Sequence, residues 1–158
     1  MNDTQNLSIP VEPNKTYFIR IINVAAFAPQ YLWFEGHTFQ VVELHGVYHN
    51  PYETDMAYIA PAQRIAILLT TKNQTTDNFA IVGAMDTDLF DKLPDGLNPN
   101  ITSYLVYNKD AALPQPALID EFKPFDDASL TAYDNETVFE DPMMSFQLDM
   151  KKIGRAHV

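Results

Sequence analysis

Thr16-Tyr-Phe-Ile-Arg-Ile-Ile-Asn-Val24 decides the fold, because β-branched and aromatic residues fill most of its positions. Such residues favour extended strands over helices. Pro13 and Asn14 precede this stretch as turn residues, so the strand is expected to begin just after them. Short stretches of similar character follow at 30–35, 38–44, 56–59, 63–71, 78–85 and 101–107. Short strands at such spacing predict an all-β sandwich or barrel, and only residues 86–93 suggest a short helix.

The overall composition allows one domain and excludes several classes of protein. The chain has 158 residues, of which 46% are hydrophobic, and this share is too high for a disordered chain. There is no cysteine, which excludes disulfides, zinc-thiolate sites and a thiol nucleophile. The net charge of −11 repels phosphate backbones, so no nucleic-acid partner is expected.

Charge and proline divide the chain into segments. Residues 86–141 contain thirteen acids and only three lysines. Prolines recur between residues 114 and 142, so residues 116–142 are predicted to be an acidic, proline-rich connector. Residues 1–115 then form a partial sandwich domain, and residues 143–151 form the first strand of a following domain.

Both ends of the sequence suggest a piece of a longer protein. Residues 1–6 lack the basic and apolar regions of a signal peptide, so the natural start is expected to be missing. Residues 152–158 are the sequence that the DNA string aagatcggaagagcacacgtc encodes. This string closely matches the start of a common short-read sequencing adapter. We therefore interpret residues 152–158 as an assembly artefact.

Asn-x-Ser/Thr sequons are unusually frequent. With 11 asparagines and 16 serines and threonines, chance predicts about one sequon. Six are present and none has proline in the middle, which predicts a glycosylated protein that is secreted or held at the extracellular face of the plasma membrane. The predicted glycosylation sites are Asn2, Asn6, Asn14, Asn73, Asn100 and Asn135.

Few residues suggest chemistry of their own. The four histidines form no His-x-His pair, and without cysteine the usual copper and zinc sites are not visible. The serines lack a nucleophile-elbow context and the glycines form no phosphate-binding loop. The remaining candidates are carboxylates: Glu35 at the end of an aromatic strand, and Asp126 and Asp127 in the connector. Spacing alone favours solvated acids at all three positions.

Several quoted segments resemble the middle cupredoxin domain of the multicopper oxidase family. The segments are Thr16-Tyr-Phe-Ile-Arg-Ile-Ile-Asn-Val24, Phe34-Glu-Gly-His-Thr-Phe-Gln-Val-Val-Glu43 and Thr54-Asp-Met-Ala-Tyr-Ile-Ala-Pro-Ala-Gln-Arg64. Within the family, Gln30-Tyr-x-Trp-x-Glu35 and Tyr107-Asn-Lys-x-Ala-Ala-Leu-Pro114 are most similar to fungal iron-transport ferroxidases. The resemblance covers residues 2–150 and implies an incomplete cupredoxin-like Greek-key β-sandwich.

The resemblance also implies a division of labour between domains. Oxidases of this kind have three cupredoxin domains, with the type 1 copper in the third and a trinuclear copper cluster between the first and third. The middle domain binds no copper, so the fragment alone is expected to be inactive. The parent protein would oxidise Fe(II) to Fe(III) and reduce O₂ to water in iron uptake, with flanking cupredoxin domains and an iron permease as partners.

By the same resemblance, Glu35 matches the iron-binding carboxylate of the middle domain, and Asp126 or Asp127 matches a second one. His37 is expected to hydrogen-bond its own turn. Two alternatives remain: a fragment of a laccase-type phenol oxidase, in which Glu35 is incidental, and a non-enzymatic cupredoxin-like binding module.

Overall fold

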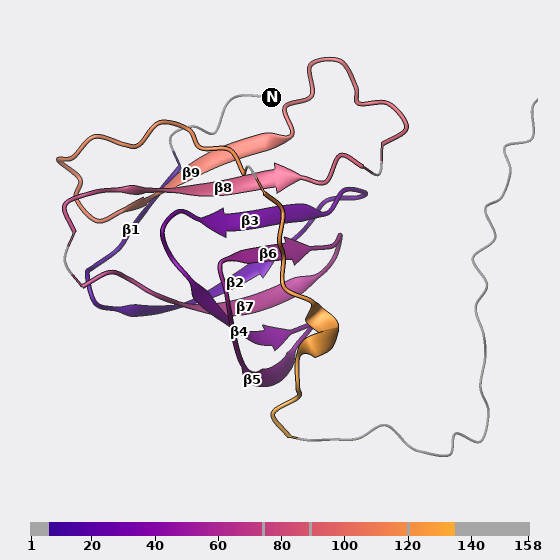
Figure 1. The fold of residues 1–158 in the computed structure, drawn as a ribbon, viewed down its shortest axis with the longest axis horizontal. Coiled ribbons are helices and arrows are strands. Elements are labelled where there is room, and N and C mark those ends of the chain that lie inside the picture. Colours follow the sequence, from indigo (N-terminus) through magenta and orange to yellow (C-terminus); the bar gives the residue numbers. More distant parts are fainter. Residues whose placement is uncertain (1–6, 74, 89, 120, 135–158) are drawn as a thin grey trace, which may run out of the picture.

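The computed structural model describes residues 7–73, 75–88, 90–119 and 121–134, which form two packed β-sheets (Figure 1). The strands are β1 (Ser8–Pro10), β2 (Thr16–Ile22), β3 (Gln30–Phe34), β4 (Phe39–Leu44), β5 (Val47–Thr54), β6 (Met56–Ile59), β7 (Arg64–Thr70), β8 (Phe79–Met85) and β9 (Asn100–Val106). A short 3₁₀ helix, η1 (Asp127–Ser129), follows in the chain. The predicted all-β sandwich is therefore confirmed.

The chain passes repeatedly from one sheet to the other. One sheet has the order β1-β9-β8-β3-β6, and the other has the order β2-β7-β4-β5. Strand pairs are antiparallel except β1 with β9, which run parallel. Because β3 pairs with β8 and ends at Phe34, the residues after β3 emerge beside the start of β8.

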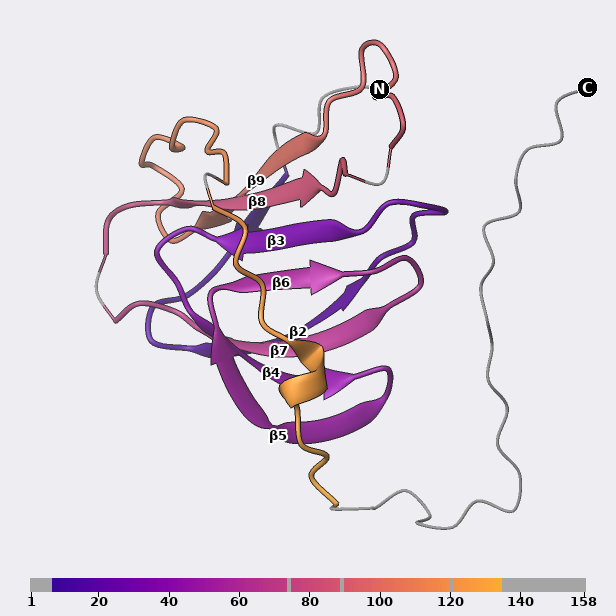
Figure 2. The ribbon, with the colours of Figure 1, turned by 45° about the vertical axis from the view of Figure 1, so that its right-hand side comes forward.

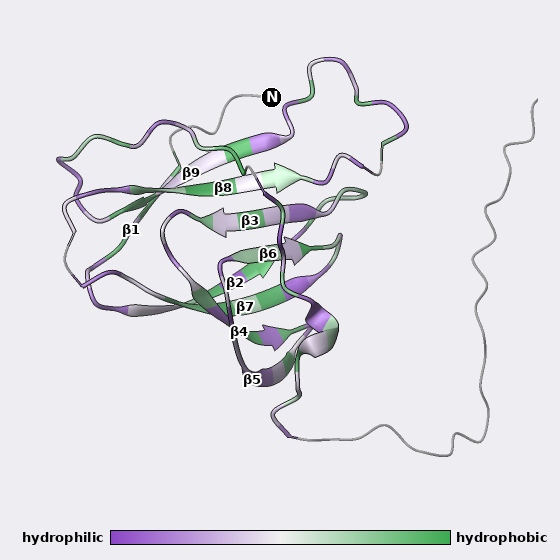
Figure 3. Cartoon of the chain, in the orientation of Figure 1, coloured by the Kyte–Doolittle hydropathy of each residue, from purple (hydrophilic) through white to green (hydrophobic). Residues whose placement is uncertain are grey.

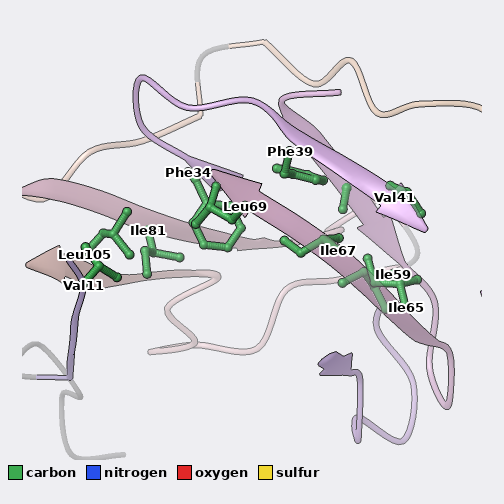
Figure 4. Packing of buried hydrophobic residues seen from close by; sticks show 11 residues of the cluster. Val11, Phe34, Phe39, Val41, Ile59, Ile65, Ile67, Leu69, Ile81 and Leu105 are labelled. Carbon is green, nitrogen blue, oxygen red and sulfur yellow. The ribbon is translucent and has the colours of Figure 1, made fainter. Parts of the chain in front are cut away.

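The core lies between the sheets. Alternate residues of β7 (Ile65, Ile67 and Leu69) are almost completely buried, and Phe39 and Val41 of β4 lie beside them. Figure 4 shows these side chains directed toward apolar residues of the other sheet and of the chain beside it: Val11, Phe34, Ile59, Ile81 and Leu105. Hydropathy agrees, because apolar residues are prominent along β7 and β8 (Figure 3). Burial of this set removes apolar surface from water and is the main stabilising contribution.

Two edge strands, β1 and β5, were not predicted. Both contain a proline: Pro10 is in an edge strand, which tolerates the missing N–H, and Pro51 lies where the register of β5 with β4 shifts, between the pairs Val41↔Tyr52 and Glu43↔Tyr48. β5 is joined to β4 by a two-residue turn in which His45 and Gly46 have φ angles of 54° and 90°. Two positive φ values define the turn that best matches the twist of a hairpin.

After β9, the described part of the chain crosses the outside of the five-stranded sheet and reaches β5 (Figures 1 and 2). Phe122 packs on Tyr31, with ring centroids 4.4 Å apart, and Phe125 lies 5.7 Å from Tyr52. Residues 131–133 then bond to β5, through Asn50 N–H to Thr131 O and Tyr133 N–H to Tyr48 O. We call residues 116–119 and 121–134 the strap, because Phe122 contacts the five-stranded sheet and Phe125 and residues 131–133 contact the four-stranded sheet.

Other sequence predictions had different outcomes. The short helix expected at 86–93 was wrong for the residues described there, which form turns and bends. The predicted strand at 143–151 and the tail at 152–158 lie outside the described residues. Across the described part of the chain, no helix is long and apolar enough to cross a membrane.

The hydroxyl of Tyr58, on the five-stranded sheet, predicts a loss of stability in alkali. The hydroxyl of Tyr58 donates to Asp86 Oδ2 at 2.7 Å, and partial burial together with this carboxylate raises the pKa of Tyr58 from 10.0 to about 12. Between these pH values the folded state holds a proton that the unfolded state releases, so stability falls as pH rises from 10.0 toward about 12. Urea unfolding at stepped pH should show this fall.

The matched controls are two tyrosine variants. Tyr58→Phe should flatten the alkaline slope, because the titrating hydroxyl is gone. Tyr52→Phe removes a hydroxyl that makes no side-chain hydrogen bond with the described residues, and it should leave the slope as in the wild type. Equal slopes in all three proteins would contradict the assignment to Tyr58.

Candidate functional site

Glu35 lies in a tight turn immediately after β3. His37 N–H donates to Phe34 O at 3.0 Å, which closes the turn over Glu35 and Gly36. Gly36 has a φ of +64°, a conformation that residues with a Cβ adopt at a cost. Because β3 is buried at Phe34 and the turn reverses at once, the Glu35 side chain is left half-buried at the end of the sandwich.

The Glu35 carboxylate is held by the neighbouring strand. Glu35 N–H donates to Ala80 O at 2.9 Å, as in a normal ladder, but Ala80 N–H donates to Glu35 Oε2 rather than to a backbone carbonyl, also at 2.9 Å. Among the described residues, no hydrogen bond reaches the other oxygen, Oε1. The carboxylate is therefore fixed through one oxygen and has the other available for a ligand.

His37 is buried behind this turn and hydrogen-bonds it, as predicted. Its Nδ1 lies 2.7 Å from Glu35 O, and its Nε2 lies 2.6 Å from the hydroxyl of Tyr107. A carbonyl can only accept, so Nδ1 carries the proton, and the neutral ring accepts at Nε2 from Tyr107. The Tyr107 oxygen in turn accepts from Lys72 N–H at 2.8 Å.

The surroundings of His37 keep the ring neutral. Burial lowers the pKa of His37 from 6.5, and the Lys72 charge lowers it further, while the hydrogen bond to the Glu35 carbonyl and the Glu35 charge act in the opposite direction. Phe79 stands edge-on to the ring at 4.8 Å. A cation at this position would lose hydration without gaining a full counter-charge.

A shallow depression lies beside the turn on the four-stranded sheet. Its volume is about 270 Å³, and its lining is mainly polar. The residues that matter here are Gly36, His37, Gln40, Glu53 and Lys72. A small hydrated ion could approach the turn from this side.

The positive φ of Gly36 yields a prediction. Gly36→Ala should lower the free energy of unfolding by about 1 kcal/mol, because a Cβ is strained at φ +64° while its contacts at 3.6 Å are ordinary. Urea unfolding measures the change. Gly96→Ala is a control in the same backbone class, with φ +76° and no neighbour within 4 Å, and it should cost a similar amount. A much larger loss at Gly36 alone would show that crowding, and not φ, dominates.

The connector acids lie elsewhere. Asp126 caps η1 by accepting from Ala128 N–H at Oδ1, 3.0 Å away, and its carbonyl accepts from Ser129. Asp127 is exposed in the first turn of η1. In both ribbon views η1 lies by β5 and apart from the arrowhead of β3, so the structure does not bring either aspartate together with Glu35 (Figures 1 and 2).

The donor set of this chain does not fit copper. The residues described contain no group of three or more His, Cys, Asp or Glu side chains that could hold a metal. A blue-copper centre needs a cysteine thiolate beside two imidazoles, and the sequence has no cysteine. A blue-copper centre in the parent would therefore take its thiolate from outside this chain.

The sequons differ in accessibility. Asn14 and Asn73 are exposed in turns whose backbones meet, since Asn14 N–H donates to Lys72 O at 3.0 Å. Asn100 begins β9 and is half-buried. Asn2, Asn6 and Asn135 lie outside the described residues.

Sequence reasoning missed Tyr107, Lys72 and Ala80 as parts of this site. Tyr107 is 70 residues from His37 in the chain, and only the pairing of β8 with β3 and β9 brings them together. The contribution of Ala80 is a backbone N–H, which no side-chain pattern reveals.

Comparisons with known proteins are extensive. The family model described as multicopper oxidase matches residues 1–110. The iron transport multicopper oxidase fetC of Epichloe festucae is 51% identical over 156 residues, which cover 98% of this chain and 25% of that protein. The iron transport multicopper oxidase FET3 of Saccharomyces cerevisiae is 44% identical over 143 residues, which cover 90% of this chain and 22% of that protein.

Solved structures of multicopper oxidases are similar to this chain as well. The crystal structure of Fet3p, a multicopper oxidase that functions in iron import, superposes with a TM-score of 0.84 at 43% identity, over 90% of this chain and 27% of that chain. A laccase from Botrytis aclada, with a TM-score of 0.64 and 24% identity, shares the fold. The chain spans about a quarter of the length of the curated relatives it matches.

Proposed function

This chain belongs to the multicopper oxidase family, and from that premise we propose that it is the middle cupredoxin domain of an iron-transport ferroxidase. The parent oxidises Fe(II) to Fe(III) and reduces O₂ to water. The observation that carries the proposal is the Glu35 carboxylate, which is fixed to Ala80 N–H through Oε2 and has Oε1 available for a ligand.

The chemistry of Glu35 suits iron. Carboxylate oxygen is a hard donor and binds Fe(III) more tightly than Fe(II), because the charge density of Fe(III) is higher. Tighter binding of the product lowers the Fe(III)/Fe(II) potential and so favours loss of the electron. A carboxylate held by one oxygen needs little reorganisation to bind the ion with the other.

A second acid would come from the strap. We assign this role to Asp126 or Asp127. The exposed Asp127 is the better donor, because one carboxylate oxygen of Asp126 already accepts the hydrogen bond that caps η1. With η1 apart from Glu35, each acid would bind or attract iron separately from the other.

The other partners follow from the domain's place in the parent. Flanking cupredoxin domains supply the copper ligands, and the absence of a group of three metal-ligating side chains among the described residues of this chain is consistent with that. The parent acts at the cell surface or outside the cell, delivers Fe(III) to an iron permease, and carries glycans at the six sequons.

The test is Glu35→Gln in the complete parent oxidase. Glutamine keeps an oxygen for Ala80 N–H and removes the charge, whereas alanine would also leave a buried N–H without a partner. We expect kcat/KM for Fe(II) to fall about tenfold while oxidation of hydroquinone is unchanged. Glu43→Gln, on β4, is the matched control and should alter neither rate. Unchanged Fe(II) oxidation would overturn the ferroxidase assignment and favour a laccase-type oxidase, and an equal loss for both substrates would overturn it by making the role of Glu35 structural.

A further inference from the structure

We propose that Tyr107 is a positioning residue for the Glu35 carboxylate and acts through the ring of His37. The inference rests on the proposed function of Glu35 as an iron ligand. Four hydrogen bonds connect the residues: Lys72 N–H to Tyr107, Tyr107 to His37, His37 to Glu35 O, and Ala80 N–H to Glu35 Oε2.

The first step is the competition for Ala80 N–H. In an antiparallel ladder this N–H would be expected to take a backbone carbonyl of the facing strand. His37 Nδ1 occupies the Glu35 carbonyl at 2.7 Å, and Ala80 N–H takes the carboxylate instead. In this arrangement the ring of His37 holds the Glu35 carbonyl, and the Glu35 carboxylate is the group that meets the sheet.

The second step is how the ring is held. The Tyr107 hydroxyl lies 2.6 Å from Nε2, and the two rings are stacked with an interplanar angle of 20°. Phe79 packs edge-on against both rings, at 4.8 Å from His37 and 5.6 Å from Tyr107. Stacking restricts the tilt of the imidazole, and the hydroxyl holds Nε2 from the side opposite the Glu35 carbonyl, so that Nδ1–H stays directed at that carbonyl.

The third step is how the hydroxyl is directed. A tyrosine hydroxyl has one hydrogen, and Lys72 N–H approaches its oxygen at 2.8 Å as a donor. The hydrogen must then point toward His37, which sets the tautomer of the ring. The loop after β7 and the end of β9 thus hold the turn after β3 in one arrangement.

The experiment compares variants of the complete parent oxidase with Fe(II) and with hydroquinone. Tyr107→Phe keeps the stacked ring and removes the hydroxyl. We expect KM for Fe(II) to rise about fivefold, with kcat and the hydroquinone rate unchanged, because one hydrogen bond that orients the ligand is lost. Tyr58→Phe is the matched control: it removes a half-buried hydroxyl bond, to Asp86, near the opposite end of β3, and should leave oxidation of both substrates unaffected.

A double variant separates positioning from general loss of structure. If Tyr107 acts through Glu35, then adding Tyr107→Phe to Glu35→Gln should raise KM for Fe(II) no further. Additive effects would overturn the inference. No effect of Glu35→Gln alone would overturn the proposed function instead, whereas an effect of Glu35→Gln without one of Tyr107→Phe would overturn only the inference.

A second pair of variants covers the case in which Tyr107→Phe fails to fold. In His37→Asn the amide nitrogen replaces Nδ1 and still reaches the Glu35 carbonyl, whereas in His37→Gln it replaces Nε2 and does not. KM for Fe(II) should therefore be higher in His37→Gln than in His37→Asn. The reverse order, or equal values, would contradict control of Glu35 through this ring.

Discussion

Replacing Asn78 with alanine is expected to lower the free energy of unfolding by more than about 3 kcal/mol. Asn78 is only 6% exposed, and the two polar atoms of its side chain bond five backbone groups. Its Oδ1 accepts from the N–H groups of Tyr107 and Asn108 at 2.9 and 3.0 Å. Its Nδ2 donates to the carbonyls of Asn108, Ala111 and Ala112 at 2.9 to 3.3 Å.

The cost is large because alanine leaves these backbone groups without the partner that replaced water. Among the described residues no other side chain bonds these groups, although the Asn108 carbonyl keeps a bond from Ala111 N–H at 3.2 Å, and a buried unsatisfied group costs about 1–3 kcal/mol. The chain after β9 would also lose its anchor, including Tyr107. The same variant should therefore weaken the contact between Tyr107 and His37.

Urea unfolding of the chain measures the loss at Asn78. Asn108→Ala is the matched control, because Asn108 Oδ1 accepts only one bond, from Asp110 N–H at 3.0 Å near the surface, and its loss should cost about 1 kcal/mol. Asn78→Asp keeps the two accepted bonds but sets a carboxylate oxygen against three carbonyls, so it should also be strongly destabilised. Similar small losses for Asn78→Ala and Asn108→Ala would show that the hydrogen bonds of Asn78 contribute little to stability.

The strands that sequence reasoning found and missed differ in where their stability comes from. β7 and β8 are buried on one or both faces, and their apolar runs are visible in the sequence. β5 reads Val-Tyr-His-Asn-Pro-Tyr-Glu-Thr and has no buried position. Its strand state comes from pairing with β4 through the hairpin at His45 and Gly46, and the composition of an exposed edge cannot show that.

The candidate site was predictable only in part, for a similar reason. Glu35 and His37 lie two residues apart, so a local turn bond could be expected from the sequence. The partners that fix them, Ala80 and Tyr107, come from β8 and from the end of β9. Such long-range contacts depend on strand order, which periodicity does not determine. The role of Glu35 in iron binding stays a prediction.

The strap gives the second large prediction. The free energy of unfolding of a chain ending at residue 115 should be about 3 kcal/mol lower than that of a chain ending at residue 134. The strap was expected to be an extended connector, and it is extended, but Phe125 and Leu130 pack against the core cluster and Phe122 packs on Tyr31. Partial burial of these three side chains contributes about 1–1.5 kcal/mol each, and the entropy lost on ordering the strap offsets part of that sum.

Edge protection adds a second readout to the strap experiment. Removal of residues 131–133 uncovers the N–H of Asn50 and the carbonyl of Tyr48 on β5, so the shorter chain should also associate at high concentration. Phe125→Ala with Leu130→Ala in the chain ending at residue 134 removes burial but keeps the pairing with β5. This variant should lose most of the stability that the strap contributes but stay monomeric, because the backbone bonds of residues 131–133 still cover the edge of β5. If the chains ending at 115 and 134 unfold at the same urea concentration, the strap only rests on the sandwich, and Asp126 and Asp127 are not held in place by it.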